Sequence, residues 1–103
     1  MALAPTADPS VFNNADAQRY EIHVDDRPAG FVSYRSVGRE TVFTHTEIDE
    51  SFEGKGIGSR LARAALDDVR ADGRAARPLC PFIAEYIKRH PEYADLVAAG
   101  QQE

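Results

Sequence analysis

The sequence predicts an α+β fold, an α/β sandwich in which helices pack on a β-sheet. Two patterns support it. Residues 19–48 form short segments of alternating or β-branched character, whereas residues 57–69 repeat apolar side chains with helical period. The length of 103 residues suits one domain and is too short for a doubly wound dinucleotide-binding fold or a (β/α)₈ barrel. Hydrophobic residues make up 43% and charged residues 28%, which is typical of a globular chain.

The first half of the domain is expected to form three antiparallel strands. Residues 1–17 are rich in Ala, Pro, Asn and Asp without periodicity, so a flexible tail is expected there, and the domain is expected over residues 18–103. A strand is predicted at residues 19–25, where Tyr20, Ile22 and Val24 alternate with polar residues. The segments that follow are a turn at 26–30, a return strand at 31–35 and a β-branched strand at 41–48.

The second half is expected to contain helices around a short strand. A helix starts at Ile57, and Gly73 is placed to end it as a left-handed C-terminal cap. Its apolar stripe consists of Ile57, Leu61, Ala62, Ala65, Leu66 and Val69. The remaining segments are a short strand at 77–80, a helix at 82–90 that Pro91 ends, and one or two helical turns at 92–99.

Charge is distributed unevenly along the chain. The 12 basic and 17 acidic residues give a net charge of −5. Residues 1–53 carry 4 basic and 10 acidic side chains (net −6), whereas residues 54–103 carry 8 and 7 (net +1). Nucleic acids and anionic membranes attract proteins with a surplus of Lys and Arg, so neither is an expected partner. The acidic excess would suit a cationic substrate such as an amine, and the acid-free stretch at 54–63 would attract a small anion.

The expected location is the cytoplasm. Cys80 is the single cysteine, which excludes an intrachain disulfide and fits a reducing compartment. No run approaches the ~20 apolar residues of a membrane span. Residues 1–16 lack the basic start and apolar run of a secretory signal.

The most informative segment is the glycine-rich stretch at residues 53–59, Glu-Gly-Lys-Gly-Ile-Gly-Ser, which joins the third strand to the first helix. Glycines let a ligand approach the main chain, and the first N–H groups of a helix lack internal partners. These donors and the helix dipole favour a phosphate. The segment does not match a Walker loop, because its lysine lies between glycines. It does not match a dinucleotide-binding fingerprint either, because Ser59 stands where the third glycine is needed. Alternatively, the glycines form only a tight turn between strand and helix, and the basic residues are simply exposed to solvent.

Together with other segments, this loop resembles the minimal, single-domain branch of the GNAT superfamily of N-acetyltransferases. The superfamily pattern is Gln or Arg, two residues, Gly, one residue, then Gly or Ala. Gly56 and Gly58 match it, and Glu53 departs from the superfamily but is usual in the minimal branch. The other matching segments are residues 45–48, 79–87 and 90–93. The resemblance covers about residues 18–98 and implies a GNAT-like mixed, mainly antiparallel sheet flanked by helices.

The resemblance implies that acetyl-coenzyme A binds as co-substrate and that the acetyl group passes to an amine of a small molecule or a protein. Ile48 would end the strand whose backbone pairs with the pantetheine arm, and the loop amides would bind the pyrophosphate. The expected coenzyme A-binding residues are Ile48, Gly54, Lys55, Gly56, Ile57, Gly58, Ser59 and Arg60. No cluster of His, Cys or carboxylates has the spacing of metal ligands, so no metal is expected.

Cys80 is the first catalytic candidate. It precedes a helix whose N–H groups would favour a thiolate, and the minimal GNAT branch carries a cysteine there. It would accept the acetyl group or assist the departing coenzyme thiolate, or it simply packs as a small hydrophobe. His45 and Glu47 are further candidates, expected on one face with Phe43, where either could deprotonate an ammonium. Tyr86 is expected in the core rather than as a general acid.

The sequence therefore favours an acetyl-coenzyme A-dependent N-acetyltransferase. The alternative is a non-catalytic coenzyme A-binding or protein-interaction domain with the same fold. Only an enzyme would release free thiol faster when an amine is added. The acceptor depends on pocket side chains that periodicity cannot place.

Overall fold

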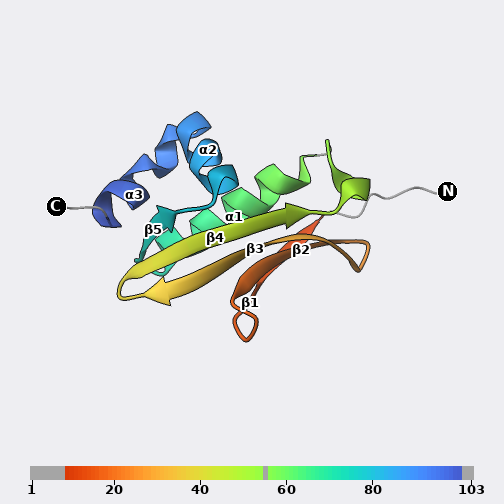
Figure 1. The fold of residues 1–103 in the computed structure, drawn as a ribbon, viewed down its shortest axis with the longest axis horizontal. Coiled ribbons are helices and arrows are strands. Elements are labelled where there is room, and N and C mark those ends of the chain that lie inside the picture. Colours follow the sequence, from red (N-terminus) through yellow and green to blue (C-terminus); the bar gives the residue numbers. More distant parts are fainter. Residues whose placement is uncertain (1–8, 55, 101–103) are drawn as a thin grey trace.

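The protein, described by a computed structural model, forms a five-stranded sheet with helices packed against it (Figure 1). The structure describes residues 9–54 and 56–100. The strand order is β1-β2-β3-β4-β5; the first four strands are antiparallel and β5 runs parallel to β4. This mixed, mainly antiparallel sheet confirms the predicted α+β class. The elements are β1 (Ser10–Asn14), β2 (Arg19–Val24), β3 (Arg27–Val37), β4 (Glu40–Ile48), η1 (Glu50–Phe52), α1 (Ile57–Ala71), β5 (Ala75–Pro78), α2 (Pro81–Arg89), η2 (Pro91–Tyr93) and α3 (Ala94–Gly100).

The flexible tail expected over residues 1–17 is wrong for residues 10–14, which form the edge strand β1. This strand pairs with β2 from Ser10 opposite His23 to Asn14 opposite Arg19. Only Val11 of β1 packs against the core, so the sequence shows none of the apolar alternation of a half-buried strand. The sheet therefore has four sequential antiparallel strands rather than three. Residues 1–8 lie outside the described residues.

The hairpin between β2 and β3 is tighter than the turn expected at residues 26–30. Asp25 and Asp26 have φ angles of 54° and 63°, as in a two-residue hairpin turn of type I′. The return strand therefore begins at Arg27 rather than at residue 31. Pro28 has no N–H to donate, and the pairing register shifts between Ile22 and His23 beside it.

A β-bulge in β4 overturns the expectation that Phe43, His45 and Glu47 share one face. Ser33 pairs with His45, while the next residue of β3 pairs with Phe43, so Thr44 is an extra residue. The bulge reverses the alternation of the strand. Phe43 is buried in the core, whereas His45 and Glu47 are exposed on the opposite face.

The apolar face of α1 closes the core as predicted. All six stripe residues are buried, and Gly73 follows the helix with a φ of 70°, which confirms the left-handed cap. Two tyrosine hydroxyls donate to successive carboxylates of α1, Tyr20 to Asp68 and Tyr93 to Asp67, each at 2.6 Å. Burial, followed by these carboxylate contacts, raises the pKa of both tyrosines above the ordinary value. Both hydroxyls therefore remain donors that tie α1 to the sheet and to η2.

The C-terminal elements agree with the expectations apart from a shift in β5. That strand occupies residues 75–78 rather than 77–80, because its N-terminal alanines supply the buried side chains. The helix expected at 82–90 is α2, displaced by one residue, and Tyr86 is buried in the core as expected. Among the helices described, none is long and apolar enough to cross a membrane.

Candidate functional site

Strands β4 and β5 separate beyond Phe43. Their parallel pairing runs from Glu40 opposite Ala75 to Phe43 opposite Pro78. The amides of Leu79 and Cys80 then both donate to the Phe43 carbonyl oxygen at 3.0 Å, and the chain turns into α2. Since β4 continues through residues 44–48, the edge of that segment has no strand partner on the β5 side within the described residues.

The glycine-rich segment forms the N-terminus of α1 beside the end of β4. Gly54 and Gly56 have φ angles of 80° and 74°, a region that favours glycine. Gly56 is the N-cap residue, no side chain caps the helix, and the first turn contains no acidic residue. The first helical amides, those of Ile57, Gly58 and Ser59, lack intrahelical acceptors because of their position. The helix therefore presents free donors and the positive end of its dipole.

A pocket of about 410 Å³ joins the end of β4 to this helix terminus. We call it the loop pocket, and its lining consists of Thr46, Ile48, Phe52, Glu53, Gly54, Gly56, Ile57, Gly58, Ser59 and Phe82. It brings together six of the eight residues expected to bind coenzyme A. Arg60 instead lines a neighbouring pocket with Arg63 and Asp67. Lys55 lies outside the described residues.

Two aromatic side chains that the sequence analysis did not assign to a site, Phe52 and Phe82, line the loop pocket. The ring of Phe82 lies against Gly58: a Cβ atom added there would be 2.6 Å from Cζ of the ring. A side chain at position 58 would therefore force the Phe82 ring to move. The structure leaves Phe82 38% exposed beside the buried positions Ile83 and Tyr86, and the helical spacing of these residues gave no signal that separates a pocket residue from a core residue.

Cys80 lies at the predicted junction, as the N-cap residue of α2, and is 1% exposed. Its Sγ atom is 2.9 Å from Oγ1 of Thr46, in the part of β4 that extends beyond the pairing with β5. Thr46 itself was not singled out from the sequence. Within the described residues, this hydroxyl is the thiol's one side-chain hydrogen-bond partner. The site therefore holds a buried thiol beside the loop pocket, and no imidazole or carboxylate of the described residues hydrogen-bonds to it.

His45 and Glu47 lie together, but across β4 from Cys80. His45 Nε2 is 2.9 Å from Glu47 Oε2, and both side chains are exposed. Thr46, between them in sequence, contacts Cys80, so consecutive residues of the strand serve opposite faces. In the part of the chain that the structure describes, no group of three His, Cys, Asp or Glu residues could hold a metal ion.

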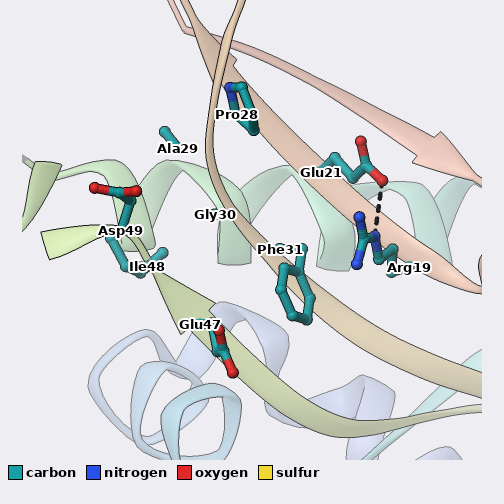
Figure 2. A pocket seen from close by; sticks show the side chains of 9 residues that line it. All are labelled: Arg19, Glu21, Pro28, Ala29, Gly30, Phe31, Glu47, Ile48 and Asp49. Atoms are coloured by element: carbon teal, nitrogen blue, oxygen red, sulfur yellow. Dashed lines mark hydrogen bonds and ion pairs between the residues drawn. The ribbon is translucent and has the colours of Figure 1, made fainter. Parts of the chain in front are cut away.

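A second pocket, of about 300 Å³, opens on the face of the sheet opposite α1. We call it the sheet pocket; Figure 2 shows it with α1 behind the strands. Its lining consists of Arg19, Glu21, Pro28, Ala29, Gly30, Phe31, Glu47, Ile48 and Asp49. Ile48 lines both pockets, so the two cavities adjoin at the end of β4.

Among the carboxyl groups that line the sheet pocket, that of Glu21 has the largest pKa shift. It accepts from Arg19 Nε at 2.7 Å and from Asn14 Nδ2 at 3.0 Å, and His23 Nε2 lies 3.2 Å away. These hydrogen bonds, with that of Arg19 first, lower the pKa of Glu21 from its ordinary 4.5 to about 2. Glu21 therefore stays ionised and matched by Arg19 over the physiological range.

Replacing Glu21 by Gln is expected to lower stability in a pH-dependent manner. Because the folded pKa lies below the unfolded one, the Glu21 carboxylate stabilises the fold above about pH 4.5, and this contribution is lost as the pH falls towards 2. Urea unfolding should show the largest difference between wild type and Glu21→Gln near neutral pH. In an Arg19→Gln background most of that difference should vanish. A difference that persists unchanged to pH 2 would contradict this assignment.

The sheet, the diverging strands and the uncapped glycine loop together define an acetyltransferase-type fold. A family model described as GCN5-related N-acetyl-transferase matches residues 19–96. The chain belongs to this family, which confirms the resemblance stated from the sequence.

The curated relatives are proteins named NATD1. The Xenopus tropicalis protein is 41% identical over 59 residues, covering 56% of this chain and 54% of the relative. The Danio rerio protein is 36% identical over 67 residues, covering 62% and 61%. The human protein is 39% identical over 59 residues, covering 56% and 52%. The matches thus span between 52% and 61% of the length of these relatives.

Two solved structures share the fold. A GCN5-like protein from Staphylococcus aureus, solved by NMR, aligns with a TM-score of 0.66 and 19% identity over 84% of this chain and 85% of that one. Ard1 from Thermoplasma volcanium aligns with a TM-score of 0.56 and 24% identity over 74% and 53%. At these identities the likeness concerns the fold alone.

Proposed function

We propose that this domain binds acetyl-coenzyme A in the loop pocket and transfers the acetyl group to an amine. One observation carries the proposal: the α1 terminus without a side-chain cap, the glycine loop and the end of β4 beyond its pairing with β5 line a single cavity. Membership of the GCN5-related family supports the reaction class.

The loop pocket suits the two ends of the coenzyme differently. The diphosphate would bind the amides of Ile57, Gly58 and Ser59, where no capping side chain competes. The pantetheine arm, which carries amide groups, would pair with the free edge of β4 up to Ile48. Lys55 and Arg60 remain proposed sources of positive charge. The apolar stretches of the arm would lie between Phe52 and Phe82.

Transfer requires an amine to attack the thioester carbonyl carbon. The new C–N bond forms, the C–S bond breaks, the attacking nitrogen gives up a further proton to become the amide nitrogen, and the sulfur leaves as a thiol that takes up one proton. The substrate ammonium must first lose a proton, to His45 or to water. A backbone N–H on the β4 edge would hold the oxyanion, and positioning the two reactants can supply on the order of 7–11 kcal/mol.

Cys80 suits a proton donor better than a nucleophile. A nucleophilic thiol is usually activated by an adjacent base, whereas the side chain that hydrogen-bonds to Cys80 among the described residues is that of Thr46. As a donor, the thiol would give its proton to the departing thiolate and regain one from solvent. The same site therefore favours direct attack by the amine.

Substitution of Cys80 tests this role. Cys80→Ala should lose about 10²-fold in turnover, the lower range for a general acid, whereas Cys80→Ser keeps a hydrogen-bond donor of much lower acidity and should lose less than Cys80→Ala without reaching wild-type turnover. Acetyl-coenzyme A affinity, measured by calorimetry, should be unchanged in both. Intact mass spectrometry should find no acetyl adduct on wild type. An adduct that is absent from Cys80→Ser would establish the covalent route instead.

A non-catalytic coenzyme A-binding domain is the second candidate, favoured by Glu53, which places a carboxylate in the loop pocket. Under both candidate functions, coenzyme A should raise the melting temperature of the protein. Only if the domain is an enzyme should free thiol appear faster when primary amines are added. Stabilisation without amine-dependent thiol release would favour the binding domain, and an unchanged melting temperature would exclude both.

A further inference from the structure

The sheet pocket adjoins the loop pocket but has no part in the proposed coenzyme A site. Its walls combine apolar surface with carboxylates at the rim. Pro28, Ala29, Phe31 and Ile48 supply the apolar surface, and Glu21, Glu47 and Asp49 supply the carboxylates. Figure 2 shows Glu47 beside the ring of Phe31, its partner across the strands. Such a lining suits a ligand with an alkyl chain and a cationic end.

The three carboxylates differ in how far protein groups already pair with them through ion pairs or hydrogen bonds. Glu21 is paired with Arg19, whose guanidinium also lies 4.5 Å from the Phe31 ring centroid. Asp49 caps η1 by accepting from the Ser51 amide at 2.9 Å, and the hydrogen bonds from Ser51, followed by the charge of Arg27, lower the pKa of Asp49. These two carboxylates are therefore engaged by the protein itself.

Glu47 is the carboxylate that remains available. Its side chain is 63% exposed, and its Oε2 atom contacts His45 Nε2 at 2.9 Å. Within the described residues, Oε1 has no hydrogen-bond partner. A primary ammonium at Oε1 would therefore form a charge-assisted hydrogen bond without displacing a protein group.

The position of Glu47 links the sheet pocket to the proposed transfer site. Glu47 follows Thr46, whose hydroxyl contacts Cys80. Because β5 has already diverged from β4, no strand among the described residues pairs with the β5-side edge of β4 at Thr46 and Glu47. Gly30 keeps the pocket in place, since a Cβ atom there would lie 2.7 Å from the Glu47 carbonyl oxygen and from Cδ1 of Ile48. Because Ile48 lines both pockets, an amine held at Glu47 would lie close to the loop pocket.

We propose that the sheet pocket is the acceptor site and that it takes an unbranched primary alkylammonium, with Glu47 as the recognition carboxylate. This inference rests on the proposed acetyl transfer. The volume of about 300 Å³ is at the lower end of ligand pockets, so it fits one alkyl chain rather than a large polycyclic amine. A free alkylamine and a lysine side chain share this chemistry.

Direct binding tests the pocket without requiring activity. In the ¹⁵N-labelled full chain, n-butylammonium should shift the amide signals of Gly30, Phe31 and Glu47, whereas butyrate should not. Glu47→Gln should weaken this binding about tenfold, because one charge-assisted hydrogen bond is lost. The matched control is Glu50→Gln, which removes a nearby carboxylate outside the lining and should change nothing. Equal shifts with butyrate, or shifts only elsewhere, would overturn the proposal.

Kinetics separate this inference from the proposed function. With n-butylamine as acceptor, Glu47→Gln should raise the KM for the amine about tenfold, with a smaller change in kcat and unchanged acetyl-coenzyme A affinity. Equal amine KM values for Glu47→Gln and Glu50→Gln would overturn the acceptor site and leave acetyl transfer standing. If acetyl-coenzyme A does not bind at all, the proposed function fails, and the n-butylammonium titration still decides the pocket. Comparing n-butylamine with a lysine-containing peptide identifies the source of the amine.

Discussion

Gly58→Val is expected to weaken acetyl-coenzyme A binding by about ten- to a hundredfold. A Cβ atom at Gly58 would lie 2.6 Å from Cζ of Phe82, so the ring must move. A ring displaced into the loop pocket occupies space that the coenzyme needs, and clearing that space again on binding would cost about 1.4–2.8 kcal/mol for a ten- to hundredfold loss of affinity. Phe82 is 38% exposed, so the protein can stay folded while the ring shifts within the loop pocket. Calorimetry with acetyl-coenzyme A and a melting curve measure the two effects.

The control for Gly58→Val is the same substitution in a Phe82→Ala background. Without the ring, the added side chain has no clash partner at that point, so the second substitution should cost much less affinity than it does in wild type. The comparison isolates the contact between the helix terminus and the ring. If Gly58→Val binds acetyl-coenzyme A as wild type does, the loop pocket is not the binding site.

Phe43→Ala is expected to lower the free energy of unfolding by about 3–5 kcal/mol. Phe43 is fully buried, and its ring centroid lies 6.4 Å from that of Tyr20 in the core. The expected loss is a large share of the roughly 5–15 kcal/mol that stabilises a domain. Urea unfolding at neutral pH measures it. Since the Phe43 carbonyl also holds the amides of Leu79 and Cys80, the cavity would lie beside the point where β4 and β5 diverge.

Phe12→Ala provides the matched control for Phe43→Ala. It removes the same atoms from β1, where Phe12 is 45% exposed and contacts His23 with ring centroids 5.0 Å apart. The expected loss is less than about 1 kcal/mol, because little apolar surface returns to water. Similar losses from the two substitutions would contradict the placement of Phe43 in the core.

The local features of the fold were predictable from the sequence. Each depends on residues close together along the chain. The buried stripe of α1 repeats with helical period from Ile57 to Val69, and Gly73 adopts the left-handed conformation expected of a cap. The mixed sheet was also predicted, in part through the family resemblance.

The strand details were not predictable, because they depend on pairing partners. β1 has a single residue, Val11, against the core, so its sequence resembles a polar tail. The bulge at Thr44 is defined by what β3 places opposite β4, and alternation along β4 alone implied the wrong face for His45 and Glu47.

By itself, the sequence determined the amphipathic helix, the glycine-rich start of that helix and the family, because these are encoded in contiguous segments. The tertiary structure decided which functional side chains lie next to one another. Thr46 reaches Cys80 across 34 positions, and Arg19, Phe31 and Glu47 line one pocket from three strands. The physical reason is that strand register and the divergence of β4 from β5 arise from non-local pairing, which no local periodicity specifies.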